Sequence, residues 1–171
     1  MISENIEKLL NEQINHEMYS AYFYLGMASY FEQEGLNGIS NWYMVQYKEE
    51  TDHAMYFYKY LHNVDGKVDL LEIKKPENGF ESVMDIFKRT LEHEQYVTSL
   101  INKIAMVARD EGDFRTLEFL QWFIKEQVEE EANAKNNIDR LRIAGDSGLF
   151  LLDQELSARI YTPSTNPPVM L

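Results

Sequence analysis

The 171-residue sequence contains no cysteine, which excludes disulfide bonds, zinc–thiolate sites, iron–sulfur clusters and cysteine nucleophiles. Any metal ion would have to be bound by oxygen or imidazole ligands. No apolar run approaches the ~20 residues that a transmembrane helix requires. Basic residues are also few, 16 against 29 acidic ones, and the net charge is −13. This charge opposes binding to phosphate backbones and anionic membranes, so we expect neither nucleic acid nor a membrane as a partner.

The N-terminal residues do not have the pattern of a signal peptide. Residues 1–10 include Glu4 and Glu7 and lack a basic lead with an apolar core, so we expect a cytoplasmic protein. The chain length suits one domain of ~100–200 residues. Hydrophobic residues make up 44% of the sequence, which is too much for a disordered chain. We therefore expect a single folded domain over residues 1–160, followed by a flexible, proline-containing tail over residues 161–171.

Glycine and proline are confined almost entirely to the breaks between long periodic stretches. The breaks lie at Gly35 and Gly38, in a linker over residues 66–79, at Gly112 and at Gly145. Between them, apolar residues recur every three or four positions, which is the period of an amphipathic helix. The pattern predicts four helices over residues 4–34, 39–65, 81–109 and 113–143, and a short fifth helix over residues 147–158.

The linker over residues 66–79 predicts the topology. A helix of 27 residues is ~40 Å long, and an extended linker of this length reaches ~46 Å, enough to return along the whole bundle. The other turns are short and make neighbouring helices antiparallel. The predicted fold is all-α: a four-helix bundle of ferritin-like connectivity with one long crossover between the second and third helices.

Polar residues interrupt the apolar stripe of every long helix near its middle, so they should converge inside the bundle. No lysine or arginine lies on any stripe, and buried carboxylates without a positive partner cost several kcal/mol each. Bound cations would remove this cost. Single glutamates from two helices and i, i+3 pairs from the other two are typical of di-iron carboxylate bundles, and these ligands suit iron or manganese. The interrupting residues are Glu17, Glu50 with His53, Glu94, and Gln127 with Glu130.

Each of these residues also has a structural interpretation. A single glutamate on an apolar stripe can extend its carboxylate to solvent, but four coincident gaps argue against chance. The neighbouring acidic residues either bind a further ion or form a solvated helix face; they are Glu49, Glu126 and Glu129. The remaining histidines lie off the stripes and are interpreted as surface residues; they are His16, His62 and His93. Two aromatic residues near the same level, Tyr24 and Trp122, are interpreted as core.

Several segments carry a resemblance to a known family. They are NEQINHEMYSAYFYL at 11–25, NWYMVQYKEETDHA at 41–54, EHE at 92–94, FLQWFIKEQVEEEA at 119–132 and LLDQELSAR near the C-terminus. Through them the chain resembles prokaryotic non-haem ferritins from about residue 2 to residue 160. The resemblance implies an iron storage protein with ferroxidase activity, which oxidises Fe(II) with O2 at a dinuclear centre. It also implies a homo-oligomeric cage of 24 subunits that stores ferric mineral, with the short last helix around the fourfold axes.

The resemblance further implies a role for each candidate residue. One iron would be bound by Glu17, Glu50 and His53, and a second by Glu50, Glu94 and Glu130, so that Glu50 bridges the two ions. Gln127 would support these ligands without binding metal directly. A third iron site would consist of Glu49, Glu126, Glu129 and Glu130, and the nearby electron donors would be Tyr24 and Trp122.

Two departures from related proteins restrict what the resemblance implies. Bacterioferritins have a haem-binding methionine where this chain has Thr51, so we expect no haem. Animal ferritins have acidic threefold pores, whereas the corresponding positions here are Leu117 and Leu120, which makes an acidic entry route doubtful. The alternatives are another di-metal enzyme, such as a manganese catalase or a rubrerythrin-type peroxidase, and a non-catalytic miniferritin-like bundle. The absence of cysteine and the low isoelectric point weigh against these alternatives.

Overall fold

The computed structural model describes residues 2–169 of the chain, and the regular secondary structure in that range is entirely helical. No helix in this range is both long enough and apolar enough to cross a membrane. The bounds of the first three helices differ from the expected ones by no more than two residues. The helices are α1 (Glu4–Gln33), α2 (Asn37–Asn63), α3 (Val83–Asp110) and α4 (Phe114–Leu156).

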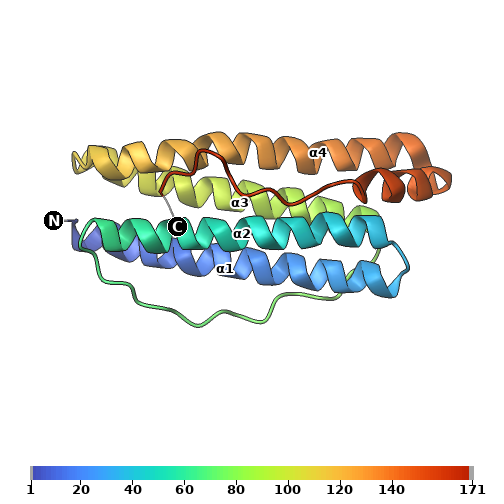
Figure 1. The fold of residues 1–171 in the computed structure, drawn as a ribbon, viewed down its shortest axis with the longest axis horizontal. Coiled ribbons are helices and arrows are strands. Elements are labelled where there is room, and N and C mark those ends of the chain that lie inside the picture. The colour runs from blue at the N-terminus through green and yellow to red at the C-terminus, as the bar shows by residue number, and fades with distance from the viewer. Residues whose placement is uncertain (1, 170–171) are drawn as a thin grey trace.

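The helices form a four-helix bundle of two antiparallel pairs (Figure 1). Helix α1 packs chiefly against α2, and α3 against α4, with further contacts between α2 and α4 and between α1 and α3. The chain between α2 and α3 runs outside α1 along nearly the whole bundle, so that α2 and α3 point in the same direction. The prediction of an all-α bundle with one long crossover is therefore confirmed.

The crossover has no regular secondary structure, and side chains of α1 hold it in place. The buried amide of Asn11 donates to the carbonyl oxygen of Lys67 at 2.9 Å and accepts from the backbone N–H of Asp69 at 2.7 Å. One turn further along α1, Asn15 donates to the carbonyl oxygen of Glu72 at 3.0 Å. These bonds satisfy backbone groups that an extended segment would otherwise leave unpaired.

Helix α4 breaks at Gly145, where φ is 60° and ψ is −170°. Only glycine adopts this conformation at little cost. The residues after the break fold back against the bundle (Figure 1) and form the short fifth helix that the sequence predicted. Leu152 and Leu156 are buried on it, whereas Ile160, which lies beyond the end of the helix at Leu156, is 82% exposed.

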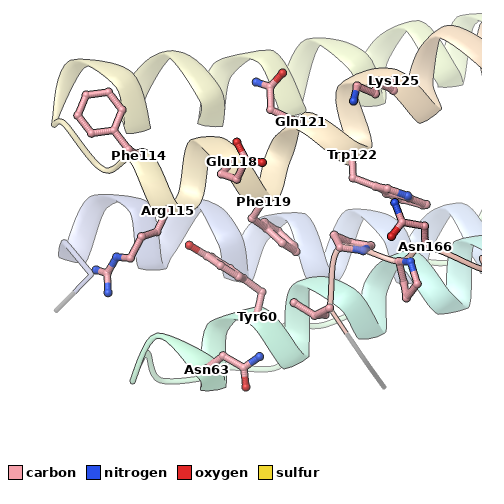
Figure 2. A pocket seen from close by; sticks show the side chains of 13 residues that line it. Tyr60, Asn63, Phe114, Arg115, Glu118, Phe119, Gln121, Trp122, Lys125 and Asn166 are labelled. Carbon is pink, nitrogen blue, oxygen red and sulfur yellow. The ribbon is translucent and has the colours of Figure 1, made fainter.

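The segment after α4 lies extended along α2 and α4 (Figure 1). The hydroxyl of Tyr161 donates to Asp52 Oδ2 at 2.5 Å, and the side chain of Asn41 donates to the carbonyl oxygen of Arg159 at 2.9 Å. Further along, residues 166–169 line a cavity of about 780 Å³ together with Tyr60 and Trp122 (Figure 2). The flexibility expected of this tail stays a prediction, but in this structure the tail has defined partners on both helices.

The apolar core consists of two clusters, one toward each end of the bundle. One contains Ile6, Leu10 and Ile14 of α1, and the other contains Tyr24, Met27 and Phe31 of the same helix. Every other helix also contributes to both clusters. The polar residues that interrupt the stripes lie between the two clusters in sequence on all four helices, which places them at mid-bundle. This arrangement positions the candidate site.

Candidate metal centre

All six residues that interrupt the stripes are buried, with no more than 4% of any of them exposed. Helices α1 and α2 bring Glu17, Glu50 and His53 together, and one potential ligand atom from each lies within 4.8 Å of the others. Within α2, His53 Nδ1 lies 3.5 Å from Glu50 Oε2. Two carboxylates and an imidazole at this spacing can bind one metal ion.

Helices α3 and α4 complete the polar centre. The carboxylate of Glu94 accepts hydrogen bonds from the hydroxyl of Tyr24 and, at 3.1 Å, from the amide of Gln127. The carboxylate of Glu130 accepts from Gln46 Nε2 at 2.9 Å. Each carboxylate thus keeps a fixed orientation, and Gln127 acts on Glu94 as a hydrogen-bond donor.

One carboxylate oxygen in the centre lacks a partner. Glu17 Oε1 accepts from Gln13 Nε2 at 2.8 Å, but when Glu17 and Glu50 are both ionised the buried Glu17 Oε2 has no hydrogen-bond donor among residues 2–169. A buried oxygen in this state costs about 1–3 kcal/mol or more. A cation bound between Glu17 and its neighbours would satisfy it, so the donor set fits a metal ion.

The carboxylates raise one another's pKa values. Burial, followed by the charge of Glu50, raises the pKa of Glu17 well above its usual range. Burial, followed by the charges of Glu94 and Glu130, does the same to the pKa of Glu50. For Glu94, burial and then the charge of Glu130 raise the pKa to about 8. The metal-free centre therefore retains protons at neutral pH, and cations would have to replace them.

The acidic residues expected at a third site are only partly brought together. Glu49 and Glu126 line one cavity of about 280 Å³, whereas Glu129 is exposed. Burial raises the pKa of Glu49 to about 7, and the guanidinium of Arg159 opposes this shift. Arg159 Nη2 lies 2.6 Å from Glu49 Oε2. No basic residue lies on the helical stripes of the sequence, and Arg159 belongs to the segment after α4.

Two polar residues that hydrogen-bond to candidate ligands were not predicted. Gln13 and Gln46 are both nearly inaccessible to solvent, and they contact Glu17 and Glu130, respectively. Each stands four residues before a candidate ligand of its own helix, Glu17 or Glu50. Spacing of i, i+4 puts both on the same helix face, so this spacing was the signal that could have identified them.

The interpretation of His93 as a surface residue holds only in part, because His93 is half-buried. Its ring packs against Tyr19, Phe23 and Tyr24, with ring centroids 5.1–6.0 Å apart, and its Nε2 lies 2.7 Å from the hydroxyl of Ser20. Burial lowers the pKa of His93 to about 4. The cause is packing between α1 and α3, which the pattern of one helix does not reveal.

Two aromatic residues adjoin the polar centre. Tyr24 is fully buried and donates to Glu94. Trp122 meets the ring of His53 edge-on at a centroid distance of 5.5 Å. Both residues therefore contact a candidate ligand directly while also packing in the core.

Comparison with known proteins agrees with this geometry. A family model described as a ferritin-like domain matches residues 7–144. Bacterial non-heme ferritins of Campylobacter jejuni and Bacteroides fragilis are 42% and 38% identical to the chain, covering 90% and 93% of it and 93% and 100% of their own lengths. A humanized archaeal ferritin matches with a TM-score of 0.94 at 47% identity, covering 95% of this chain and all of its own. An open pore ferritin from the hyperthermophilic archaeon Archaeoglobus fulgidus matches with a TM-score of 0.92 at 45% identity, covering 93% of this chain and 98% of its own. The chain belongs to the ferritin family.

Proposed function

We propose that the protein stores iron and that each subunit oxidises Fe(II) with O2 at the mid-bundle centre. The observation that carries this proposal is the cluster of Glu17, Glu50 and His53, which is buried and has an unpartnered carboxylate oxygen on Glu17. Such a cluster is destabilising in a metal-free protein and becomes favourable when cations bind. Iron is the substrate here, and the named relatives are ferritins.

The ligands divide between two Fe(II) ions. Glu17, Glu50 and His53 bind the first ion, and Glu50, Glu94 and Glu130 bind the second, with Glu50 between them. Four carboxylates neutralise the charge of two divalent ions. Since the carboxylates stabilise Fe(III) more than Fe(II), the site favours oxidation. Each Fe(II) gives one electron, so that O2 receives two electrons at one site.

The neighbouring polar residues have supporting roles. Gln127 holds Glu94 in place through its amide. Tyr24 donates a hydrogen bond to the same carboxylate and is the candidate donor of a further electron to the second ion. Trp122, in contact with His53, is the corresponding donor beside the first ion.

An outer site would bind a third ion on its way to or from the dinuclear centre. Its ligands are Glu49, Glu126, Glu129 and Glu130. Glu49 and Glu126 already line one cavity that His53 also borders, while Glu129 lies exposed on α4 and joins the ligands when an ion is bound.

Assembly into a 24-subunit cage in the cytoplasm would provide the space for mineral. The short helix after Gly145 has an exposed apolar side, with Phe150 and Leu151 66% and 62% exposed. Exposed apolar groups of this kind mark interaction surfaces, and we assign this one to contacts around the fourfold axes. Sedimentation combined with iron analysis tests this directly: a very large particle rich in iron is expected, and a small iron-poor particle would exclude storage.

Oxygen consumption tests the oxidase. Fe(II) added in air should consume O2 and produce soluble ferric absorbance, and the His53→Ala variant should react at least tenfold more slowly because it lacks a ligand of the first ion. His62→Ala is the matched control, since His62 is exposed on the same helix. Equal rates for both variants would refute the site. Disproportionation of hydrogen peroxide without iron uptake would instead support a catalase-type enzyme.

A further inference from the structure

Arg159 is held against the bundle by several partners. Its Nη2 lies 2.6 Å from Glu49 Oε2, and its Nη1 donates to Gln46 Oε1. The guanidinium carbon stands 4.9 Å above the ring of Trp42, and the backbone carbonyl oxygen accepts from Asn41 at 2.9 Å. The side chains of Arg159 and Glu49 are only 23% and 25% exposed. Both charges are therefore partly shielded from water, where their attraction is screened less than at an exposed surface pair.

The contact with Gln46 links Arg159 to the inner centre. A guanidinium can only donate hydrogen bonds and a carboxylate can only accept them. The fully buried amide of Gln46 therefore has a single orientation, with Oε1 toward Arg159 and Nε2 toward Glu130 Oε2 at 2.9 Å. Arg159 thus contacts the outer carboxylate Glu49 directly and acts on the inner ligand Glu130 through one amide.

Arg159 competes with a metal ion for Glu49. One oxygen of Glu49 already accepts from the guanidinium, and two cations at the same carboxylate repel each other. We propose that Arg159 is a built-in cation of the outer site: it binds Glu49 while no metal is present, and a metal ion held by Glu49 and Glu126 displaces it. This inference rests on the proposed function, because it concerns the third ion.

Displacement of Arg159 also affects the chain that follows it. Residues 162–165 line the same cavity as Glu49 and Glu126, and residues 166–169 lie against Tyr60 and Trp122 (Figure 2). When the guanidinium leaves Glu49, the segment over residues 157–169 loses its ion pair with α2. Metal binding at the outer site should therefore loosen residues 157–169, and the cavity beneath them should become more open.

Titration of the assembled, metal-free protein with Zn(II), followed by calorimetry, tests the competition. The wild-type protein should bind two ions per subunit tightly and a third more weakly. In Arg159→Gln, the third ion should bind about tenfold more tightly, because its competitor is gone. The charge-matched control is Arg109→Gln, since Arg109 pairs with Asp110 on the surface of α3 and its removal changes the net charge equally.

A double-mutant cycle shows whether Arg159 acts through Glu49. Glu49→Gln should abolish the third binding step, and the double variant with Arg159→Gln should not restore it. If Arg159→Gln and Arg109→Gln bind the third ion equally, the inference is wrong while the proposed function stands. If no third ion binds in any variant, the inference and the outer site are both wrong, while the proposed oxidation at the dinuclear centre stands. If the wild-type protein fails to bind the two tight ions, the proposed function itself is refuted.

Hydrogen exchange measured by mass spectrometry gives an independent readout. Three equivalents of Zn(II) should speed exchange in peptides that cover residues 157–169 of the wild-type protein. Arg159→Gln should show this faster exchange already without metal, whereas Glu49→Gln should show no response to Zn(II). Exchange that stays unchanged by Zn(II) in the wild-type protein would overturn the proposed displacement.

Discussion

Replacing Glu94 with glutamine should stabilise the metal-free protein at high pH. Burial and the charge of Glu130 raise the pKa of Glu94 to about 8 from a usual 4.5, and each pKa unit corresponds to 1.36 kcal/mol. The folded protein therefore retains a proton that the unfolded chain loses. The stability gained from this proton is complete below pH ~4.5 and is lost as the pH rises through 8, a decline of about 5 kcal/mol.

Thermal unfolding in the presence of a chelator measures this decline. About 4 kcal/mol of the decline falls between pH 5 and pH 9, and a chain of this size loses about 2–4 °C of Tm per kcal/mol, so Glu94 alone contributes a fall of about 8–16 °C over that range. Glutamine carries no titratable proton, so the Tm of Glu94→Gln should not include the fall that Glu94 contributes in the wild-type protein. The Tm difference between the variant and the wild-type protein should accordingly grow by that amount as the pH rises.

The matched control is Glu92→Gln, because Glu92 is exposed on α3 only two residues away. Its Tm difference from the wild-type protein should stay constant with pH. Zn(II) should restore the stability of the wild-type protein at pH 9 and should help Glu94→Gln less, since a ligand is missing. A Tm difference for Glu94→Gln that does not vary with pH would refute the account of the centre as a cluster of desolvated carboxyl groups.

Three further substitutions have defined outcomes. Gly26→Ala should raise the free energy of unfolding by about 1 kcal/mol, because an added Cβ meets no atom within 4 Å; a lower Tm would contradict this. Gly38→Ala should lower it by about 1–3 kcal/mol, because the Cβ would collide with the backbone of Asp153; an unchanged Tm would contradict this. Tyr24→Phe removes a hydrogen bond that lowers the pKa of Glu94 and should weaken Zn(II) binding at pH 7 about tenfold; calorimetry showing equal affinity would refute this.

The sequence predicted which polar residues are buried at mid-bundle because helical periodicity carries that information. Glu17, Glu50 and Glu94 stand at positions where an apolar residue would continue the stripe, and all are buried in the structure. Their depth in the core depends only on which face of each helix points inward. Periodicity along single helices was sufficient for that.

The position of Arg159 could not be obtained in the same way. It depends on the break at Gly145, on the direction in which the following helix folds back and on the contacts of a segment that has no periodicity. His93 shows the same limit, because its aromatic neighbours belong to α1. Contacts between segments far apart in the chain are set by the tertiary structure, and local patterns carry little information about them.

The division of the apolar core into two clusters has a consequence for how the subunit can be altered. Leucine and methionine in place of the central glutamates would join the two clusters into one continuous apolar interior, and replacing buried ionic groups in this way often increases stability. We expect such a redesigned bundle to tolerate more heat than the natural one while being inert toward iron. The natural sequence thus keeps a polar, less stable layer between its two apolar clusters, and the proposed chemistry depends on that layer.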